Sequence, residues 1–267
     1  MSGAKIAIGG KGGVGKTTLC AVWAQLFAED GLDVLAIDAD PNANLSSAFG
    51  IPSEKAPQPL IKMKELIARR TGTGKEAVGA YFRLNPKVAD LPEKYWLKAG
   101  KVKILVVGAI TQAGAGCACP EGAFLKALLS HTVLERQELV LVDLAAGVES
   151  FGRASIEGID ALIVVVEPGG RSIETANNIV RMAGESGVGC IAAIANKIME
   201  AAQVDVIKAG LKDAVLLGSV GYSRSVQEAD LRRDAVIGAD AEFVEQLREA
   251  KGRLEELIFS RTGKVDN

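Results

Sequence analysis

A glycine-rich segment near the amino terminus carries the strongest chemical signal of this chain. Residues 10–17 read Gly-Lys-Gly-Gly-Val-Gly-Lys-Thr and satisfy the phosphate-loop pattern G-x-x-x-x-G-K-[ST]. Glycines let successive backbone N–H groups turn toward an anion, and the helix that follows adds the positive end of its dipole. Lys16 can reach the β- and γ-phosphates, and the Thr17 hydroxyl can ligate Mg²⁺. The residues expected to contact the nucleotide, which we expect to be ATP, are Gly12, Gly13, Val14, Gly15, Lys16, Thr17 and Thr18.

Aspartates stand at the ends of two expected strands. Asp38 and Asp40 follow the apolar run 34–37, and Asp143 follows the run 139–142. Ligands of open α/β sheets bind at the carboxyl ends of the strands, so these carboxylates are candidates to work with the phosphate loop. Solubilising a strand end or capping a helix is the alternative role for such aspartates.

Two thiols on one short glycine-rich loop form a second candidate site. Cys117 and Cys119 are separated by one residue and lie between an expected strand and an expected helix. Thiolates suit soft or borderline metals, and metal binding deprotonates them. Two sulfurs leave a tetrahedral or square-planar ion half satisfied, whereas a two-fold dimer would supply four. Structural thiols or a redox pair are the alternatives. His131, the only histidine, is expected on a helix surface, and Cys20 and Cys190 in the core.

Composition narrows the class of protein. The chain has 267 residues, of which 48% are hydrophobic, and a formal net charge of -2. The balanced charge argues against a general nucleic-acid binder. We expect no secretory signal and no membrane span, since no run reaches the roughly 20 apolar residues that a span needs. Four cysteines without a disulfide pattern fit a reducing cytoplasm.

Apolar runs alternate with helical patterns along the chain. The expected strands are 5–8, 34–37, 103–107, 139–142, 161–166, 190–195 and 215–220. The expected helices between them are 17–30, 60–70, 122–136, 172–186 and 201–208. Several strands are apolar throughout, as strands buried on both faces of a parallel sheet are. The pattern predicts an α/β fold with a doubly wound, mostly parallel sheet and helices on both faces, the P-loop NTPase class.

Two regions depart from this alternation within a single expected domain, 1–267. Residues from about 50 to 101 contain much of the chain's proline and predict an insertion with one helix and an irregular return. Residues from about 240 to 258 predict an amphipathic helix. A membrane-surface helix would carry lysine and arginine on its polar face. Glutamates dominate here, so we expect this helix to pack on the sheet.

The phosphate loop carries an early second lysine, Lys11. With it, the loop resembles the deviant Walker A of the MinD/ParA/nitrogenase-iron-protein superfamily. The resemblance implies that Lys11 crosses a dimer interface to the partner's nucleotide, so that ATP binding favours a homodimer. A second cation near the transferring phosphoryl group is chemically sensible, because charge spreads over its oxygens.

The same resemblance assigns roles to the carboxylates. Asp40 would orient or polarise the attacking water, and Asp38 would support Mg²⁺ through a water. Asp143 resembles the Walker B aspartate. Gly147, four residues on, completes the D-x-x-x-G of a second switch, where a backbone N–H can sense the γ-phosphate.

Asn196 and Lys197 follow the apolar run 190–195 and look like the superfamily's base-contacting Asn-Lys pair. Asn196 would then read adenine through its amide, and a capping or turn asparagine is the alternative. A later segment that also lies against the base in the superfamily usually carries proline where this chain has Gly221. That departure leaves the role of the segment open.

Along nearly its whole length the chain resembles one branch of the superfamily, the CooC/AcsF accessory ATPases of carbon monoxide dehydrogenase and acetyl-CoA synthase maturation. Beyond the phosphate loop, the shared segments are 38–41, 84–88, 117–119, 142–149, 166–168 and 195–197. The resemblance implies nickel delivery or insertion coupled to ATP hydrolysis, with Ni²⁺ shared between Cys117 and Cys119 of two subunits and Zn²⁺ competing for them. The implied partners are a second copy of the chain and one of those two nickel enzymes.

Two alternatives come from the same superfamily. A MinD/ParA-type positioning or partition ATPase would need a basic DNA-binding surface or a basic membrane helix. The near-neutral charge and the acidic carboxyl-terminal helix speak against both. An iron-protein-like reductase would place a cysteine just after the second switch, and residues 145–152 contain none.

Overall fold

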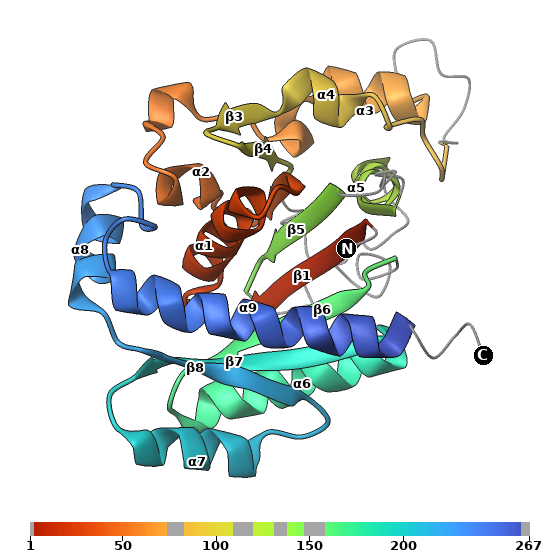
Figure 1. The fold of residues 1–267 in the computed structure, drawn as a ribbon. Helices are drawn as coiled ribbons and strands as arrows, with labels where there is room; N and C mark the ends of the chain where they lie inside the picture. Colours follow the sequence, from red (N-terminus) through yellow and green to blue (C-terminus); the bar gives the residue numbers. More distant parts are fainter. Residues whose placement is uncertain (1–2, 74–82, 109–119, 131–137, 147–157, 263–267) are drawn as a thin grey trace.

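The computed structural model describes residues 3–73, 83–108, 120–130, 138–146 and 158–262. Eight strands form one sheet in the order β3-β4-β2-β5-β1-β6-β7-β8 (Figure 1). Their bounds are β1 Ala4–Gly10, β2 Asp33–Ala39, β3 Leu97–Ala99, β4 Val102–Val106, β5 Glu138–Leu144, β6 Ala161–Val166, β7 Cys190–Ile198 and β8 Val215–Gly221. This mostly parallel sheet confirms the expected fold class.

Burial on both faces explains the parallel strands. Every residue of β1 and of β6 is buried, which matches their continuous apolar sequence. The sequence did not predict β3, a three-residue strand that pairs antiparallel with β4. Its turn contains Gly100 at φ 60°, a left-handed conformation that glycine adopts without steric cost.

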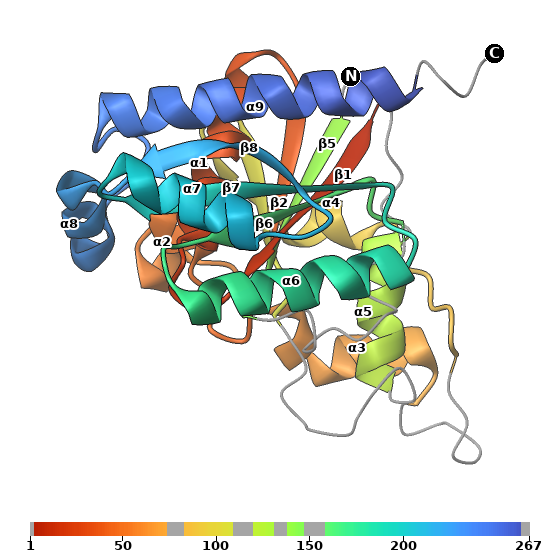
Figure 2. The same ribbon diagram turned by 90° about the horizontal axis from the view of Figure 1, so that it is seen from below.

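Helices cover both faces of the sheet (Figures 1 and 2). One face packs against α1 (Lys16–Glu29) and α9 (Ala241–Thr262). The other packs against α3 (Lys64–Thr71), α5 (Pro120–Ser130), α6 (Gly170–Glu185) and α7 (Ala201–Gly210). The shorter helices are α2 (Leu45–Ala48), α4 (Leu91–Tyr95) and α8 (Arg224–Arg232). The helices pack their apolar faces against the two faces of the sheet. The ends of the strands are therefore left open, and a site can form there.

The insertion is more regular than its sequence indicates. The expected helix 60–70 is divided into a 3-10 turn, Leu60–Lys62, and α3. The break is at Met63, whose ψ of 67° is not helical. A second helix, α4, was not expected, although Pro92 in its first turn is a helix-start signal. The expectation of one helix in this region was therefore wrong. The end of the expected helix 122–136 lies outside the described residues.

Helix α9 packs on the sheet as its pattern predicts. Phe243, Leu247 and Leu254 are buried. The indole N–H of the buried Trp23 in α1 donates to the Leu247 carbonyl at 2.9 Å, which joins α9 to the helix that begins in the phosphate loop. Within the described part of the chain, no helix is long and apolar enough to span a membrane.

The Trp23→Phe substitution tests this link. It removes the only polar atom of the indole and part of its packing, so the free energy of unfolding should fall by about 1–3 kcal/mol. Urea unfolding followed by circular dichroism measures it. Gln25→Ala on the same helix is the control and should change the value by less than about 0.5 kcal/mol. Equal losses in the two variants would contradict a specific role for Trp23.

Candidate functional site

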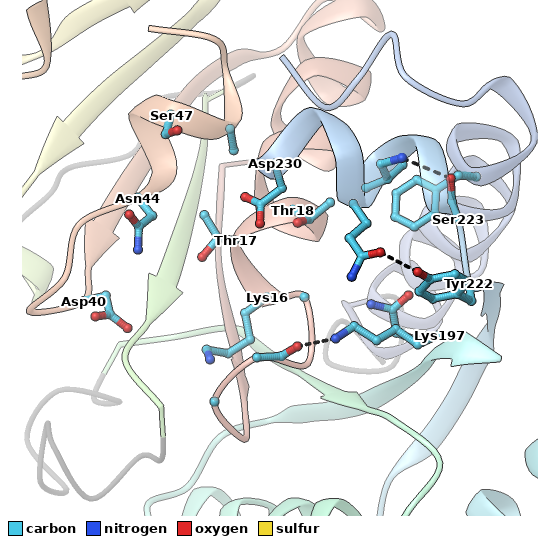
Figure 3. Close-up of a pocket in the computed structure, with 18 of the residues that line it drawn as sticks. Lys16, Thr17, Thr18, Asp40, Asn44, Ser47, Lys197, Tyr222, Ser223 and Asp230 are labelled. Atoms are coloured by element: carbon cyan, nitrogen blue, oxygen red, sulfur yellow. Dashed lines mark hydrogen bonds between the residues drawn. The ribbon is translucent and has the colours of Figure 1, made fainter. Parts of the chain in front are cut away.

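The carboxyl ends of the strands meet around one pocket. A cavity of about 680 Å³ is lined by the phosphate loop, the segment after β2, the end of β7 and the segment after β8. Figure 3 shows Asp40 and Lys197 on opposite sides of Lys16, facing the same space. This is the edge at which an α/β sheet binds ligands. The structure therefore brings Lys16, Thr17, Asp40 and the Asn196-Lys197 pair together around one pocket.

Glycine is required in the phosphate loop for steric reasons. Gly15 has φ 98°, and a Cβ there would lie 2.4 Å from the Asn196 amide nitrogen. Gly10 has φ 147°, and a Cβ there would lie 2.6 Å from the Val165 carbonyl oxygen. Any side chain would push the loop away from β6 or β7. The two glycines thus fix how closely the loop approaches its neighbours.

Side chains hold three carbonyls of the loop. The three hydrogen bonds are Lys16 Nζ to the Lys11 carbonyl at 3.2 Å, Lys197 Nζ to the Gly13 carbonyl at 2.5 Å, and Asn196 Nδ2 to the Val14 carbonyl at 2.8 Å. A peptide whose carbonyl is held by a side chain has its N–H fixed in the opposite direction. The bonds therefore orient the loop's N–H groups for an anion before one arrives.

Asn196 and Lys197 thus have a role that the sequence did not predict. The Asn196 side chain is almost fully buried, and its amide nitrogen is bonded to the loop. Lys197 has φ 59°, a left-handed conformation that costs a non-glycine residue about 1–2 kcal/mol. The strained backbone directs its ammonium to Gly13. Adenine contact by Asn196 stays a prediction.

Thr17 and Asp143 offer oxygen ligands of the kind that Mg²⁺ prefers. The Thr17 hydroxyl donates to Asp143 Oδ2 at 2.6 Å. The other oxygen, Asp143 Oδ1, is buried and has no hydrogen-bond partner among the described residues. A buried carboxylate oxygen without a partner costs free energy unless a cation or water satisfies it. These groups therefore fit a magnesium ion held with the nucleotide.

Two buried acids lie side by side on adjacent strands. Asp38 in β2 pairs in register with Asp143 in β5. Burial, and then the charge of Asp38, raises the pKa of Asp143 to about 7. Burial, and to a smaller extent the charge of Asp40, raises the pKa of Asp38 to about 6. Burial also lowers the pKa of Lys16. Without a bound cation, both carboxyls therefore ionise less readily than an exposed aspartate does, and the pKa of Asp143 is the more strongly raised.

Asp38 joins two loops. Its carboxylate accepts the backbone N–H groups of Asp40 at 3.1 Å and Leu45 at 2.8 Å. Its carbonyl accepts the N–H groups of Val107 at 2.8 Å and Gly108 at 3.1 Å. The first pair folds the segment after β2, and the second fixes the residues just before segment 109–119. Support of Mg²⁺ by Asp38 through a water stays a prediction.

Lys11 has an acidic neighbour that the sequence did not predict. Its ammonium lies 3.3 Å from Glu167 Oε1, and the ammonium of Lys197 lies 3.7 Å from Glu167 Oε2. Glu167 follows β6 directly, so its position at a strand end was a usable signal. The sequence patterns placed it only within the shared segment 166–168, without a role.

The far end of the pocket is formed by β8 and α8. Ser223 caps α8 by accepting the Val226 N–H at 3.2 Å, and the Tyr222 hydroxyl donates to Gln227 at 2.5 Å (Figure 3). The sequence did not predict α8, although serine is among the residues preferred at the position before a helix. Gly221 lines the pocket, so this segment does lie at the site.

Three expected site residues, Cys117, Cys119 and Gly147, lie outside the described residues, and so does His131, which was expected on a helix surface. Among the residues that are described, no group of three or more His, Cys, Asp or Glu is arranged to hold a metal. Cys20 and Cys190 are buried in the core, as expected. Burial raises the pKa of Cys20, which keeps that thiol protonated and unreactive.

Known proteins match this chain along most of its length. Residues 5–236 match the family described as the CobQ/CobB/MinD/ParA nucleotide binding domain. The carbon monoxide dehydrogenase accessory protein CooC of Rhodospirillum rubrum is 44% identical over 228 residues, which cover 85% of this chain and 86% of CooC. An uncharacterized ATP-binding protein of Methanocaldococcus jannaschii is 39% identical over 229 residues, 85% of this chain and 88% of that protein.

Solved structures share the fold at lower identity. The MinC:MinD cell division protein complex of Aquifex aeolicus contains a chain with a TM-score of 0.69 and 20% identity, covering 95% of this chain and 96% of that one. The septum site-determining protein MinD of Pyrococcus horikoshii, complexed with Mg-ADP, also has a TM-score of 0.69, at 18% identity, with 96% and 97% coverage. These likenesses support the sheet topology.

The Asp143→Asn substitution tests the buried acids. Both carboxyls have a folded pKa above the ordinary value of 3.8, so the folded chain holds more protons than the unfolded chain between pH 4 and 7. The free energy of unfolding should therefore fall as pH rises through this range. At pH 8, without nucleotide or Mg²⁺, the Asp143→Asn variant should be about 1–3 kcal/mol more stable than the parent chain.

The difference in the free energy of unfolding between the Asp143→Asn variant and the parent chain should shrink at pH 5, where Asp143 of the parent chain is protonated. Urea unfolding at both pH values gives the comparison. The matched control is Asp205→Asn, which changes an exposed carboxylate on α7 and should follow the parent chain at each pH. The same stability difference at pH 5 and pH 8 would show that Asp143 is not held as the structure indicates.

Proposed function

This chain belongs to the CobQ/CobB/MinD/ParA nucleotide-binding family and is a P-loop ATPase, and we propose that it is a metallochaperone. It would bind nickel between two subunits and support nickel insertion into carbon monoxide dehydrogenase or acetyl-CoA synthase. The similarity to CooC over 85% of the chain supports this accessory function. The observation that carries the proposal is the set of hydrogen bonds made by Asp38. Its carboxylate bonds to the segment after β2, which lines the nucleotide pocket, and its carbonyl bonds to the residues just before the Cys-x-Cys segment.

The phosphate loop holds ATP through its oriented N–H groups and Lys16. Thr17 and Asp143 hold Mg²⁺, which neutralises charge on the phosphates when bound. Asp40 lines the pocket and accepts the Asn42 N–H at 2.8 Å, so its carboxylate lies on a folded segment at the phosphate end. From there it orients the attacking water. Gly147 follows Asp143 and senses the γ-phosphate.

The surroundings of Lys11 support a dimer. Its side chain is 40% exposed, its ammonium pairs with Glu167, and Lys11 is not among the residues that line the pocket of its own subunit. Once released from Glu167, such a lysine could act on the nucleotide of a second copy. Two chains related by a two-fold axis would exchange these lysines, which makes the ATP-bound state a homodimer.

Nickel is the cargo of the proposed thiol site. Cys117 and Cys119 from each of two subunits supply four sulfurs, a set that suits Ni²⁺ and for which Zn²⁺ competes. Free thiolates of this kind need a reducing compartment, so we place the protein in the cytoplasm. The whole chain, residues 1–267, would act as one ATPase domain in this process.

Nucleotide state reaches the thiol segment through Asp38. ATP hydrolysis changes the ligands of the segment after β2, which Asp38 folds through its carboxylate. The same residue holds Val107 and Gly108 through its carbonyl. A shift of the end of β2 would therefore move the segment after β2 together with Val107 and Gly108. Hydrolysis would alter how tightly two facing thiol segments hold the ion.

A MinD/ParA-type positioning ATPase is the alternative. Membrane positioning would need free basic residues on a surface helix. In α9, Arg248 lies within 3.5 Å of Glu245, Lys251 within 3.0 Å of Glu255, and Arg253 within 3.4 Å of Glu249. These basic side chains are paired on the helix itself, which favours the metallochaperone.

The Lys11→Ala substitution tests the lysine in trans. The variant should bind ATP about as well as the parent chain and lose ATP-driven dimerisation. Its turnover should fall by about 10²-fold or more, since a cation at the developing charge is missing. Sedimentation and phosphate release measure both effects. Lys208→Ala, at an exposed lysine on α7, is the control. Full turnover in the Lys11→Ala variant would remove the proposed role.

The double substitution Cys117→Ser and Cys119→Ser tests the metal site. The parent chain should bind about one Ni²⁺ or Zn²⁺ per two chains, and the variant should lose this binding while keeping ATP binding. Equilibrium dialysis with each metal gives the stoichiometry. Cys190→Ser, at a buried thiol in β7, is the control and should keep metal binding. Unchanged titrations in the double variant would refute the site.

A further inference from the structure

Glu167 lies between two lysines at the rim of the phosphate loop. Its carboxylate oxygens are 3.3 Å from the Lys11 ammonium and 3.7 Å from that of Lys197. Its backbone N–H donates to the Ser172 hydroxyl at 3.1 Å, which fixes the turn into α6. The side chain is 24% exposed, less than either lysine. Glu167 is thus an ordered anion beside the loop that binds an anion.

The two lysines are not equally bound. Lys197 also donates to the Gly13 carbonyl at 2.5 Å, and its left-handed backbone directs it there. Lys11 is 40% exposed, and its ammonium pairs with Glu167. Loss of Glu167 would leave Lys197 on the loop and would release Lys11.

This pairing opposes the action of Lys11 in trans. A lysine side chain held by its own subunit's carboxylate is not available to the phosphates of another subunit. The contact is partly exposed, and such ion pairs are weak. The phosphates of a bound nucleotide can therefore displace it, while a chain without nucleotide keeps it.

We propose that Glu167 is a positioning residue that holds Lys11 within its own subunit until ATP is bound in a facing subunit. The inference rests on the proposed function, because it assumes that Lys11 acts across a dimer. Glu167 would thereby set the protein concentration at which ATP drives two chains together. It prevents lysine exchange between chains that carry no nucleotide.

Glu167→Gln is the test, since it keeps the shape of the side chain and removes its charge. With a non-hydrolysable ATP analogue, the dimer of this variant should dissociate at a concentration about 2- to 10-fold lower than the parent dimer. Specific ATPase activity should reach half its maximum at a correspondingly lower protein concentration. The kcat at saturating protein and ATP should stay within about 2-fold, because Lys11 is intact.

Two further variants separate charge from structure. Glu167→Asp keeps the charge and should return the dissociation constant of the dimer toward the parent value. Asp33→Asn removes a carboxylate that pairs with Lys103 at the opposite end of β2, and it should leave the constant unchanged. A Glu167→Gln dimer as weak as the parent, or weaker, would overturn the proposal, since Glu167 would then not restrain Lys11.

A second readout does not depend on dimers. Limited acetylation of the nucleotide-free chain at low concentration, followed by mass spectrometry, measures how available each lysine is. Lys11 should react about 2- to 5-fold faster in the Glu167→Gln variant than in the parent chain, relative to Lys208. If the parent chain never dimerises with the analogue, the proposed dimeric function fails and the dimer-control part of the inference fails with it, while acetylation still tests whether Glu167 restrains Lys11. An unchanged Lys11 rate would overturn it.

Discussion

The orientation of the phosphate loop is the constraint on which the site depends. Three of its carbonyls are held by side chains, two of them from the end of β7, a strand two places from β1 in the sheet. These bonds turn the loop's N–H groups toward the pocket without a ligand. The sheet therefore has to place β7 correctly before the loop can bind phosphate, and the buried apolar layers on both faces do so. The cost is visible in the left-handed backbone of Lys197.

Local sequence patterns were enough for most of the fold. Continuous apolar strands, helical spacing and a loop motif identified the sheet, its edge and the residues at that edge, because these signals depend on neighbours in sequence. The 3-10 turn before α3, the edge strand β3 and helices α4 and α8 were missed, since each is too short to show a clear periodic pattern. The three-residue strand β3, for example, forms only through its antiparallel pairing with β4.

The sequence predicted which residues belong to the site, but it did not predict which residues they contact. The pattern identified Lys11, Asp38 and Asn196, yet their contacts with Glu167, Gly108 and Val14 join residues from 70 to 182 positions apart. Such pairings come from strand order, which periodicity does not specify. The register of Asp38 with Asp143 is a further case, because only adjacent strands make two separate motifs into one coupled acid pair.

The strand order also fixes how far the phosphate loop lies from the strand that precedes the thiol segment in the chain. From β1, which leads into the phosphate loop, to β4, there are three strand spacings of about 4.8 Å, or about 14 Å in all. Phosphate oxygens favour hard cations, and thiolate sulfurs favour softer ones. In the proposed function, hydrolysis would thus release phosphate three strand spacings from β4, and the two kinds of ion chemistry would start from different strands of one sheet.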